Sequence, residues 1–362
     1  MVALDSVKHA ALCKMVDYLF EDPETRFPKA MEMVDKAAPR NLFPSQREAF
    51  RNAIDEKNNW YQLLMKIAHL NPDVRNRLVK SFLIDSNLMV WGEQEKNRDK
   101  YQCNIPWLIL FDPTSACNMH CVGCWAGEYG NKNNLSFEDM DKIVTEGKEL
   151  GVYFYIYTGG EPLVRKKNLL EIARRHSDCE FMTFTNGTLI GNGFADELLR
   201  VKNIIPVLSV EGFEESTDAR RGSGTFAKVV LAMDILREKK LPFGISCCYT
   251  SNNLDSISSD EYVDQMVKWG AKFVWYFHYM PVGNDAVTGL LPTAAQREYM
   301  YHRIREIRST KPMFAMDFQN DGEHVGGCIA GGRRYFHINA NGDADPCVFI
   351  HYSDSNIREK SL

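Results

Sequence analysis

The sequence predicts an α/β fold in which parallel strands alternate with helices. Short apolar runs recur through the middle of the 362-residue chain, most of them separated by about the 30 residues of one strand–helix–strand unit. The runs are apolar on both faces, as expected for parallel strands covered by helices. We expect six strands, at 107–111, 152–157, 181–185, 206–210, 243–249 and 273–279. Six such units form a partial (β/α)6, TIM-like barrel, two units short of the closed eight.

The segment before the first strand predicts helices. Apolar residues recur at near-helical spacing at Phe50, Ile54, Trp60, Leu63, Leu64 and Ile67, and Asn71-Pro72 is a typical helix start. We therefore predict a helical cap or docking domain over residues 1–100.

The rest of the chain divides into two further predicted domains. The partial barrel occupies 101–290, and we expect its strand–helix repeat to end after residue 281. A long polar helix at about 293–310 then leads into a small cysteine-bearing module, which completes the third domain, 291–362.

The composition limits the class of protein. Hydrophobic residues make up 44% and charged residues 25%, as in ordinary soluble globular proteins, and the net charge of -5 gives no reason to expect a nucleic-acid partner. No apolar stretch approaches the roughly 18 to 20 residues of a transmembrane helix, and the N-terminus lacks the pattern of a signal peptide. We therefore expect a cytoplasmic protein whose ten cysteines are mostly thiols, so that clustered cysteines indicate metal or redox chemistry.

Three cysteines cluster directly after the first predicted strand, in "TSACNMHCVGCWAGEYG". The carboxyl end of a strand is where this class of fold places its chemistry. A structural zinc site would need a fourth ligand, for which His120 or Cys103 are candidates, and no second Cys-x-x-Cys pair is near. A [4Fe–4S] cluster takes one ligand per iron, so Cys117, Cys121 and Cys124 would leave one iron open to a substrate.

The second and third predicted strands also end in polar motifs. "YTGGEP" contains Gly159, Gly160 and Glu161, and the two glycines allow the backbone to approach a ligand closely. "FTNGT" closes the third strand with a turn that begins at Asn186.

The fourth strand leads into "SVEGFEESTDARRGSGTF", which contains Ser209, Arg220 and Arg221. A guanidinium group suits a carboxylate ligand because it forms two parallel charge-assisted hydrogen bonds.

Together, in this order, Cys-x3-Cys-x2-Cys, GGEP and Ser-x-Glu-Gly…Asp-x-x-Arg-Gly resemble the radical S-adenosylmethionine (SAM) superfamily and its SPASM/twitch-related subgroup. The resemblance implies that Cys117, Cys121 and Cys124 hold a [4Fe–4S] cluster, whose open iron is chelated by the amino and carboxylate groups of SAM. One electron from the reduced cluster would split SAM into methionine and a 5′-deoxyadenosyl radical, which abstracts a hydrogen atom from the substrate. An enzyme is therefore expected, with flavodoxin or ferredoxin as a suitable reductant.

The resemblance also assigns the contacts to SAM. The segment Gly159–Glu161 would bind the amino group, Ser209 the ribose, and Arg221, with Arg220 as its rival, the carboxylate. The resemblance also places Asn186 among the residues that contact SAM. The family usually has an aromatic residue just before the third cysteine, where this chain has Gly123, so Trp125 or a side chain from the later strands is expected to contact the adenine.

The C-terminal tail resembles the opening half of a SPASM domain. Cys328 and Cys347 bracket Gly342 as Cys-x13-Gly-x4-Cys, within a predicted hairpin that turns at Asn341-Gly342. The pair suggests an auxiliary [4Fe–4S] cluster, but two thiolates cannot complete one, so we expect a truncated chain or a reduced module. For the cysteines outside these motifs we expect core packing: Cys13, Cys103, Cys179, Cys247 and Cys248.

The substrate is less constrained. A ribosomally made peptide or another protein is the first candidate, and a lipid chain, tetrapyrrole or small metabolite is the alternative. The aromatic run "WYFHYM" (275–280) is either barrel core or a substrate wall, with His278 or Tyr279 able to donate a proton or hydrogen atom. A non-catalytic iron–sulfur or zinc-binding protein is the third candidate, although a structural cluster would need no SAM site.

Overall fold

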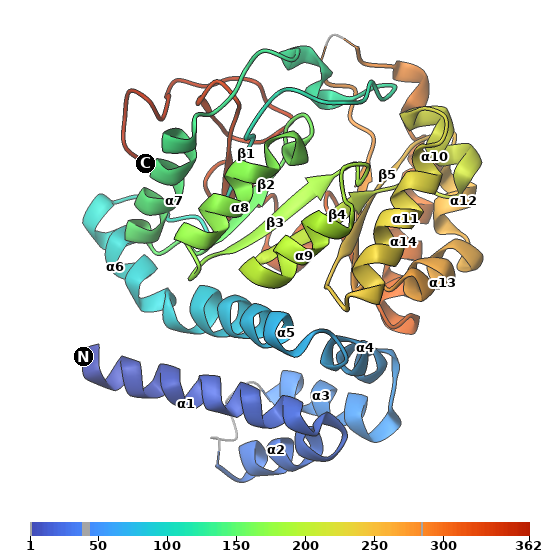
Figure 1. The fold of residues 1–362 in the computed structure, drawn as a ribbon. Helices are drawn as coiled ribbons and strands as arrows, with labels where there is room; N and C mark the ends of the chain where they lie inside the picture. Colours follow the sequence, from blue (N-terminus) through green and yellow to red (C-terminus); the bar gives the residue numbers. More distant parts are fainter. Residues whose placement is uncertain (1, 38–43, 284) are drawn as a thin grey trace.

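The computed structural model describes residues 2–37, 44–283 and 285–362 (Figure 1). Within them lies one nine-stranded sheet of order β7-β6-β5-β4-β3-β2-β1-β8-β9, in which all neighbours are parallel except β8 and β9. The strands are β1 Leu108–Phe111, β2 Phe154–Tyr157, β3 Glu180–Thr185, β4 Ile204–Ser209, β5 Gly244–Tyr249, β6 Phe273–His278, β7 Phe314–Asp317, β8 Tyr335–Ile338 and β9 Ala344–Asp345. The predicted α/β fold with a parallel sheet is confirmed, and each of the six predicted strands is present to within a few residues.

Helices cover the outer face of the sheet, as Figure 1 shows for α7, α8, α9 and α11. The α-helices that follow β1 in the chain are α7 Phe137–Leu150, α8 Lys166–Arg175, α9 Asn192–Val201, α10 Glu214–Arg221, α11 Thr225–Glu238, α12 Leu254–Ser258, α13 Asp260–Trp269, α14 Ala294–Thr310 and α15 Gly322–Val325. The sequence explains their ends. In α7, Ser136 and Asp139 form the capping box that the sequence suggests, and Gly151 stops the helix with a φ of 89°.

The strand–helix repeat continues beyond residue 281, which corrects our expectation. Helix α14 is followed by β7, which pairs in parallel with β6 as a seventh unit. The predicted hairpin at Asn341-Gly342 is present as β8 and β9, but β8 also pairs in parallel with β1 on the other side of the barrel. Both additions are short strands, and a four-residue run carries little periodicity for a sequence-based assignment.

The sheet curves into an open barrel with a core of its own. Phe318, just after β7, lies 6.4 Å from Tyr335 of β8 between ring centroids, although six strands lie between β7 and β8 in the sheet. The interior is filled by apolar side chains from several strands, among them Leu108, Phe154 and Met182. A larger core lies between the outer face of the sheet and the helices.

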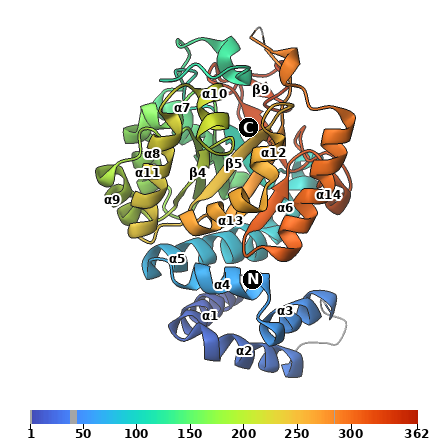
Figure 2. The ribbon, with the colours of Figure 1, turned by 90° about the vertical axis from the view of Figure 1, so that its right-hand side faces the viewer.

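The N-terminal segment is helical, as predicted. It contains α1 Val2–Glu21, α2 Pro23–Ala37, α3 Pro44–Glu56, α4 Asn59–Ala68, α5 Pro72–Val79, a π-helix Lys80–Met89 and α6 Trp91–Tyr101. Figures 1 and 2 place α1–α3 at the end of the molecule opposite α10. From the π-helix, Phe82 reaches the amino-terminal end of the barrel, 5.8 Å from Trp107 and 5.7 Å from Phe154. The division into three domains remains a prediction.

Across the described ranges, no helix is both long and apolar enough to cross a membrane.

Candidate functional site

A cavity opens at the carboxyl ends of the strands. Its empty space is about 1240 Å³, part of which is open solvent. Because the strands are parallel, the motifs that follow β1, β2, β3 and β4 all reach this edge of the sheet. Every residue predicted for the SAM cluster and for SAM itself contributes to the lining: Cys117, Cys121, Cys124, Trp125, Gly159, Gly160, Glu161, Asn186, Ser209 and Arg221.

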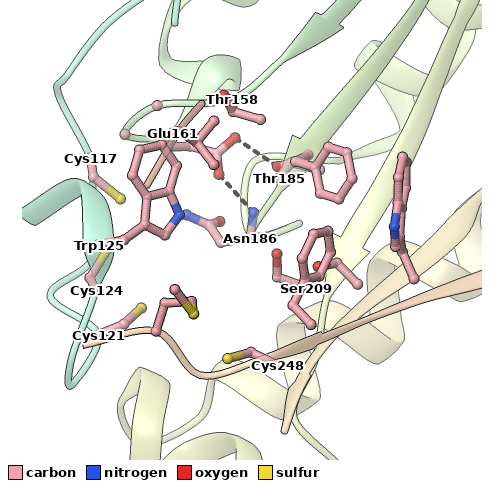
Figure 3. A pocket seen from close by; sticks show the side chains of 18 of the residues that line it. Cys117, Cys121, Cys124, Trp125, Thr158, Glu161, Thr185, Asn186, Ser209 and Cys248 are labelled. Carbon is pink, nitrogen blue, oxygen red and sulfur yellow. Dashed lines mark hydrogen bonds between the residues drawn. The ribbon is translucent and has the colours of Figure 1, made fainter. Parts of the chain in front are cut away.

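The three clustered cysteines lie on one side of this cavity, opposite Thr185, Asn186 and Ser209 (Figure 3). All three are half-buried and free of disulfides. Burial raises the pKa of Cys117 to about 11 and also raises that of Cys121, although the Arg221 guanidinium opposes the rise at Cys121. Cys117 and Cys121 are therefore protonated thiols at neutral pH when no metal is bound, and a bound metal would convert them to thiolates.

The arrangement of these thiols fits a cluster better than a single ion. Among the described residues, no group of three or more His, Cys, Asp or Glu side chains is placed to hold one metal ion. A zinc ion draws its ligands to within about 2.3 Å of one point, whereas a [4Fe–4S] cluster takes one thiolate on each of separate irons. Three thiols on one side of the cavity that are not placed to hold one ion match the second donor set, and His120 and Cys103, the candidate fourth zinc ligands, are both exposed.

The cysteine loop is held by the backbone of the GGE segment. The amide of Gly160 donates to the carbonyl of Thr114 at 3.0 Å, and that of Glu161 donates to Ala116 at 2.9 Å. A Cβ on Gly159 would lie 2.7 Å from the Thr114 carbonyl oxygen, and one on Gly160 would overlap the carbonyl oxygens of Ser115 and Ala116. The sequence suggested that the glycines admit a ligand, but their immediate neighbour is the cysteine loop itself.

Glu161 links this segment to the end of β3. Its carboxylate accepts hydrogen bonds from the Thr185 hydroxyl at 2.6 Å, the Asn186 amide at 2.7 Å and the Leu163 amide at 2.9 Å. The side chain is 1% exposed, and burial raises the pKa of this carboxyl. The buried Glu161 carboxylate therefore anchors the GGE segment to the end of β3.

The turn after β3 reaches the cysteine loop directly. The Asn186 side-chain amide donates to Asn118 Oδ1 at 2.9 Å, and Asn118 donates in turn to the Thr188 hydroxyl at 2.9 Å. Asn118 lies between the first and second cysteines. A second motif thus fixes the same loop.

The two arginines of α10 share one buried carboxylate. Arg220 Nη1 lies 2.6 Å from Glu211 Oε1, and Arg221 Nε lies 2.9 Å from the same oxygen. Burial raises the pKa of Glu211, but the two guanidinium groups outweigh it and lower the pKa below its usual value. The backbone carbonyl of Arg220 also accepts a hydrogen bond from the Val122 amide at 2.8 Å. This cluster therefore fixes the C-terminal part of the cysteine loop.

An aromatic ring occupies the space beside Gly123. Gly123 has a φ of 66°, and a Cβ there would lie 2.6 Å from the Tyr279 hydroxyl oxygen. Tyr279 follows β6, is 2% exposed, and accepts a hydrogen bond from the Val287 amide at 2.8 Å. Trp125 lies elsewhere in the lining, 6.3 Å from both His337 and Phe349 between ring centroids.

A buried ion cluster joins the C-terminal hairpin to the start of the site. His337 of β8 is fully buried, with Nε2 3.0 Å from Asp112 Oδ1 and Nδ1 3.4 Å from Asp345 Oδ2. Both contacts are ion pairs when the imidazole is protonated. Asp112 directly follows β1, and its carboxylate also accepts a hydrogen bond at 2.7 Å from the hydroxyl of Thr158, the residue before Gly159.

The C-terminal cysteines are not part of the cavity lining. Cys328 is exposed, whereas Cys347 is buried with its sulfur 3.1 Å from the Tyr335 hydroxyl. Burial raises the pKa of Tyr335, and the two cysteines add to that effect, Cys347 more than Cys328. A role for this pair in an auxiliary cluster remains a prediction.

The cysteines outside the motifs are placed unevenly. Cys179 and Cys247 are fully buried, as expected, and Cys13 is half-buried. Cys103 is exposed, and Cys248 lines the cavity, so core packing was wrong for these two. Cys248 lies on the inward face of β5, which a single residue in an apolar run does not reveal.

Several residues of the site were missed by sequence reasoning, and most of them act on the cysteine loop from a distance. They are Asp112, Asn118, Thr188, Glu211 and His337. Glu211 lies inside a motif that the sequence singled out, but its burial between two arginines depends on the tertiary fold.

Comparison with known proteins identifies the domain that forms this site. Residues 111–273 match the model of the Radical SAM superfamily. The chain is 24% identical over 286 residues to the AdoMet-dependent heme synthase of Methanosarcina barkeri, covering 71% of this chain and 81% of that protein. It is 29% identical over 206 residues to the mycofactocin maturase MftC of Mycolicibacterium smegmatis, covering 55% of this chain and 51% of that protein.

The fold has solved counterparts. The crystal structure of Streptococcus suis SuiB bound to precursor peptide SuiA has a TM-score of 0.61 at 19% identity, covering 81% of this chain and 69% of that chain. The solved structure supports the fold, and the family match with the sequence relatives supports the predicted superfamily and its maturase-containing subgroup. The predicted cofactors, a [4Fe–4S] cluster and SAM, are confirmed at the level of the superfamily. The chain carries a radical SAM domain and is an enzyme.

Proposed function

We propose that the chain cleaves SAM reductively and uses the resulting radical to abstract a hydrogen atom from a substrate bound in the same cavity. The observation that carries this proposal is the convergence of three half-buried thiols with Ser209, Arg221 and the GGE backbone on one cavity. A non-catalytic iron–sulfur protein would need the thiols alone.

In this proposal Cys117, Cys121 and Cys124 bind the cluster through their sulfur atoms. When bound and reduced, the cluster supplies the electron that splits SAM into methionine and a 5′-deoxyadenosyl radical. The remaining residues orient SAM and exclude water from the radical.

We assign the contacts to SAM from the cavity lining. The Gly159–Glu161 backbone would bind its amino group, Ser209 its ribose and Arg221 its carboxylate. Arg221 uses Nε and Nη2 on Glu211, so a carboxylate of SAM would be received by the guanidinium edge that remains. Asn186 fixes the cysteine loop and contributes to the same lining.

The substrate class is suggested by the relatives. MftC is named as a maturase, SuiB was crystallised with a precursor peptide, and the Methanosarcina protein is named as a heme synthase. A peptide or protein is therefore one candidate and a tetrapyrrole the other. The reductant, a flavodoxin or ferredoxin, and the cytoplasm as location belong to the same proposal.

The test is anaerobic reconstitution with iron and sulfide, followed by reduction with dithionite and addition of SAM. We expect 5′-deoxyadenosine and methionine in equal amounts. Absence of 5′-deoxyadenosine from protein whose cluster is spectroscopically intact would overturn the proposal.

A further inference from the structure

Five large aromatic rings form a continuous wall inside the cavity. We define the aromatic wall as Phe184, Trp275, Phe277, Phe318 and Phe349, all of which line the cavity. The ring centroids of Phe184 and Trp275 are 5.5 Å apart, and those of Phe277 and Phe318 are 4.9 Å apart. Trp275 stacks on Phe277 at 5.8 Å, and Phe349 joins Phe318 at 6.3 Å. The rings come from β3, β6 and two later loops, so the wall depends on the curvature of the sheet.

The wall is not simply barrel core. Along β6, Val274, Tyr276 and His278 are buried, whereas the two wall residues of this strand, Trp275 and Phe277, are half-buried. The other three wall residues are also half-buried. Of the two expectations for the run 275–280, the alternation of β6 therefore fits a substrate wall at Trp275 and Phe277 and core at Tyr276.

Charge is confined to other parts of the lining. Among the described residues of the lining, the acidic and basic side chains other than histidine are Glu161, Arg220 and Arg221. Glu161 bonds to Thr185 and two backbone amides, and both arginines bond to Glu211. The one histidine, His278, is neutral because burial lowers its pKa to about 4. The wall thus offers no charged partner to a ligand.

These features define the ligand chemistry. Half-buried aromatic area inside a cavity gains stability when apolar atoms cover it, and aromatic pairs gain about 0.5 to 1.5 kcal/mol beyond the area they bury. Rings presented at several mutual angles, from stacked to edge-on, match the edge-to-face and offset contacts that another ring makes. A charged or strongly polar group would lose its hydration there without a partner.

We propose that the substrate presents an aromatic ring system to this wall. The inference rests on the proposed function, and it narrows the substrate to two sources of one chemistry: an aromatic side chain of a peptide, or a planar macrocycle such as a porphyrin. Aliphatic lipid chains fall outside it.

The test measures retention of probes by the reconstituted, SAM-bound enzyme in anaerobic equilibrium dialysis. One pair of probes is a capped Gly-Gly-Tyr-Gly-Gly peptide and its Gly-Gly-Leu-Gly-Gly match. The other pair is an iron porphyrin and palmitate. We expect one aromatic probe to bind at least tenfold more tightly than its non-aromatic match, and the pair in which this occurs identifies the source.

Variants locate the binding. Phe277→Leu and Trp275→Leu keep an apolar side chain but remove a ring, and each should weaken the aromatic probe about two- to twelvefold. Phe314→Leu is the matched control, because Phe314 is 40% exposed on β7 and packs on Trp60 outside the barrel. Iron content and the circular dichroism spectrum should be unchanged in all three variants, which shows that they fold.

Any of three results would overturn the inference. The two members of each pair of probes bind equally, neither aromatic probe is retained, or both wall variants bind the aromatic probe as tightly as the parent does. Failure of the proposed function has a different signature. In that case no 5′-deoxyadenosine would form, while the preference for aromatic probes would persist.

Discussion

The buried histidine of β8 allows a quantitative prediction. Burial alone would lower the pKa of His337, but the carboxylates of Asp112 and Asp345 outweigh that effect and raise it from the ordinary 6.5 to about 9. One pKa unit corresponds to about 1.4 kcal/mol, so the protonated imidazole contributes about 3 kcal/mol to the free energy of unfolding. Replacing it in His337→Gln should remove that amount.

The sign of the pH dependence follows from the raised pKa. The contribution is fully present below pH 6.5, where the unfolded chain also binds the proton, and it is lost as the pH rises through about 9. We therefore expect His337→Gln to be less stable than the parent by about 3 kcal/mol at pH 6 and by less than about 1 kcal/mol at pH 10.

The assay is urea unfolding of the cluster-free protein, followed by circular dichroism across this pH range. The matched control is His324→Gln. The side chain of His324 is 56% exposed and pairs with Glu323. A surface pair of this kind contributes at most about 1 kcal/mol. If His337→Gln lowered the free energy of unfolding by the same amount at pH 6 and pH 10, the reasoning would be refuted, because a loss of packing does not depend on pH.

Three further predictions concern the loop and its supports. Gly160→Ala should weaken SAM binding at least tenfold in calorimetry, because its Cβ would overlap two carbonyl oxygens of the cysteine loop. Gly191→Ala is the control and should bind SAM as the parent does, because a Cβ at Gly191 has no neighbouring atom within 4 Å. Glu211→Gln should lower the free energy of unfolding by about 3 to 5 kcal/mol in urea, because it breaks a buried ion cluster; a loss below about 1 kcal/mol would contradict this. Cys347→Ala should leave the absorbance of the SAM cluster unchanged, because Cys347 does not line the cavity; loss of that absorbance would show that the two sites depend on each other.

Much of the barrel could be predicted because its strands are buried on both faces. Runs such as 152–157 are apolar throughout, and helices such as α7 carry their own capping signals. The polar motifs at the strand ends followed from the same topology, since parallel strands bring their carboxyl ends to one edge. Local sequence was sufficient for these features.

The missed features depend on contacts between distant parts of the chain. The strand β8 pairs with β1 although the two are more than 200 residues apart in sequence, and nothing in "YFHI" specifies that neighbour. His337 acquires its meaning only from Asp112, which this pairing brings to it. Tyr279 fills the space beside Gly123 in the same way, through the curvature of the sheet and not through any local pattern.

The most direct test of the account is the production of 5′-deoxyadenosine by the reconstituted enzyme and by Cys121→Ala. Cys121 lines the cavity as one of the three proposed cluster ligands. The account predicts that the parent protein converts SAM to 5′-deoxyadenosine under dithionite, and that Cys121→Ala, equally folded by circular dichroism, loses both the cluster absorbance and the product. Cleavage of SAM by Cys121→Ala at the parent rate would contradict the account.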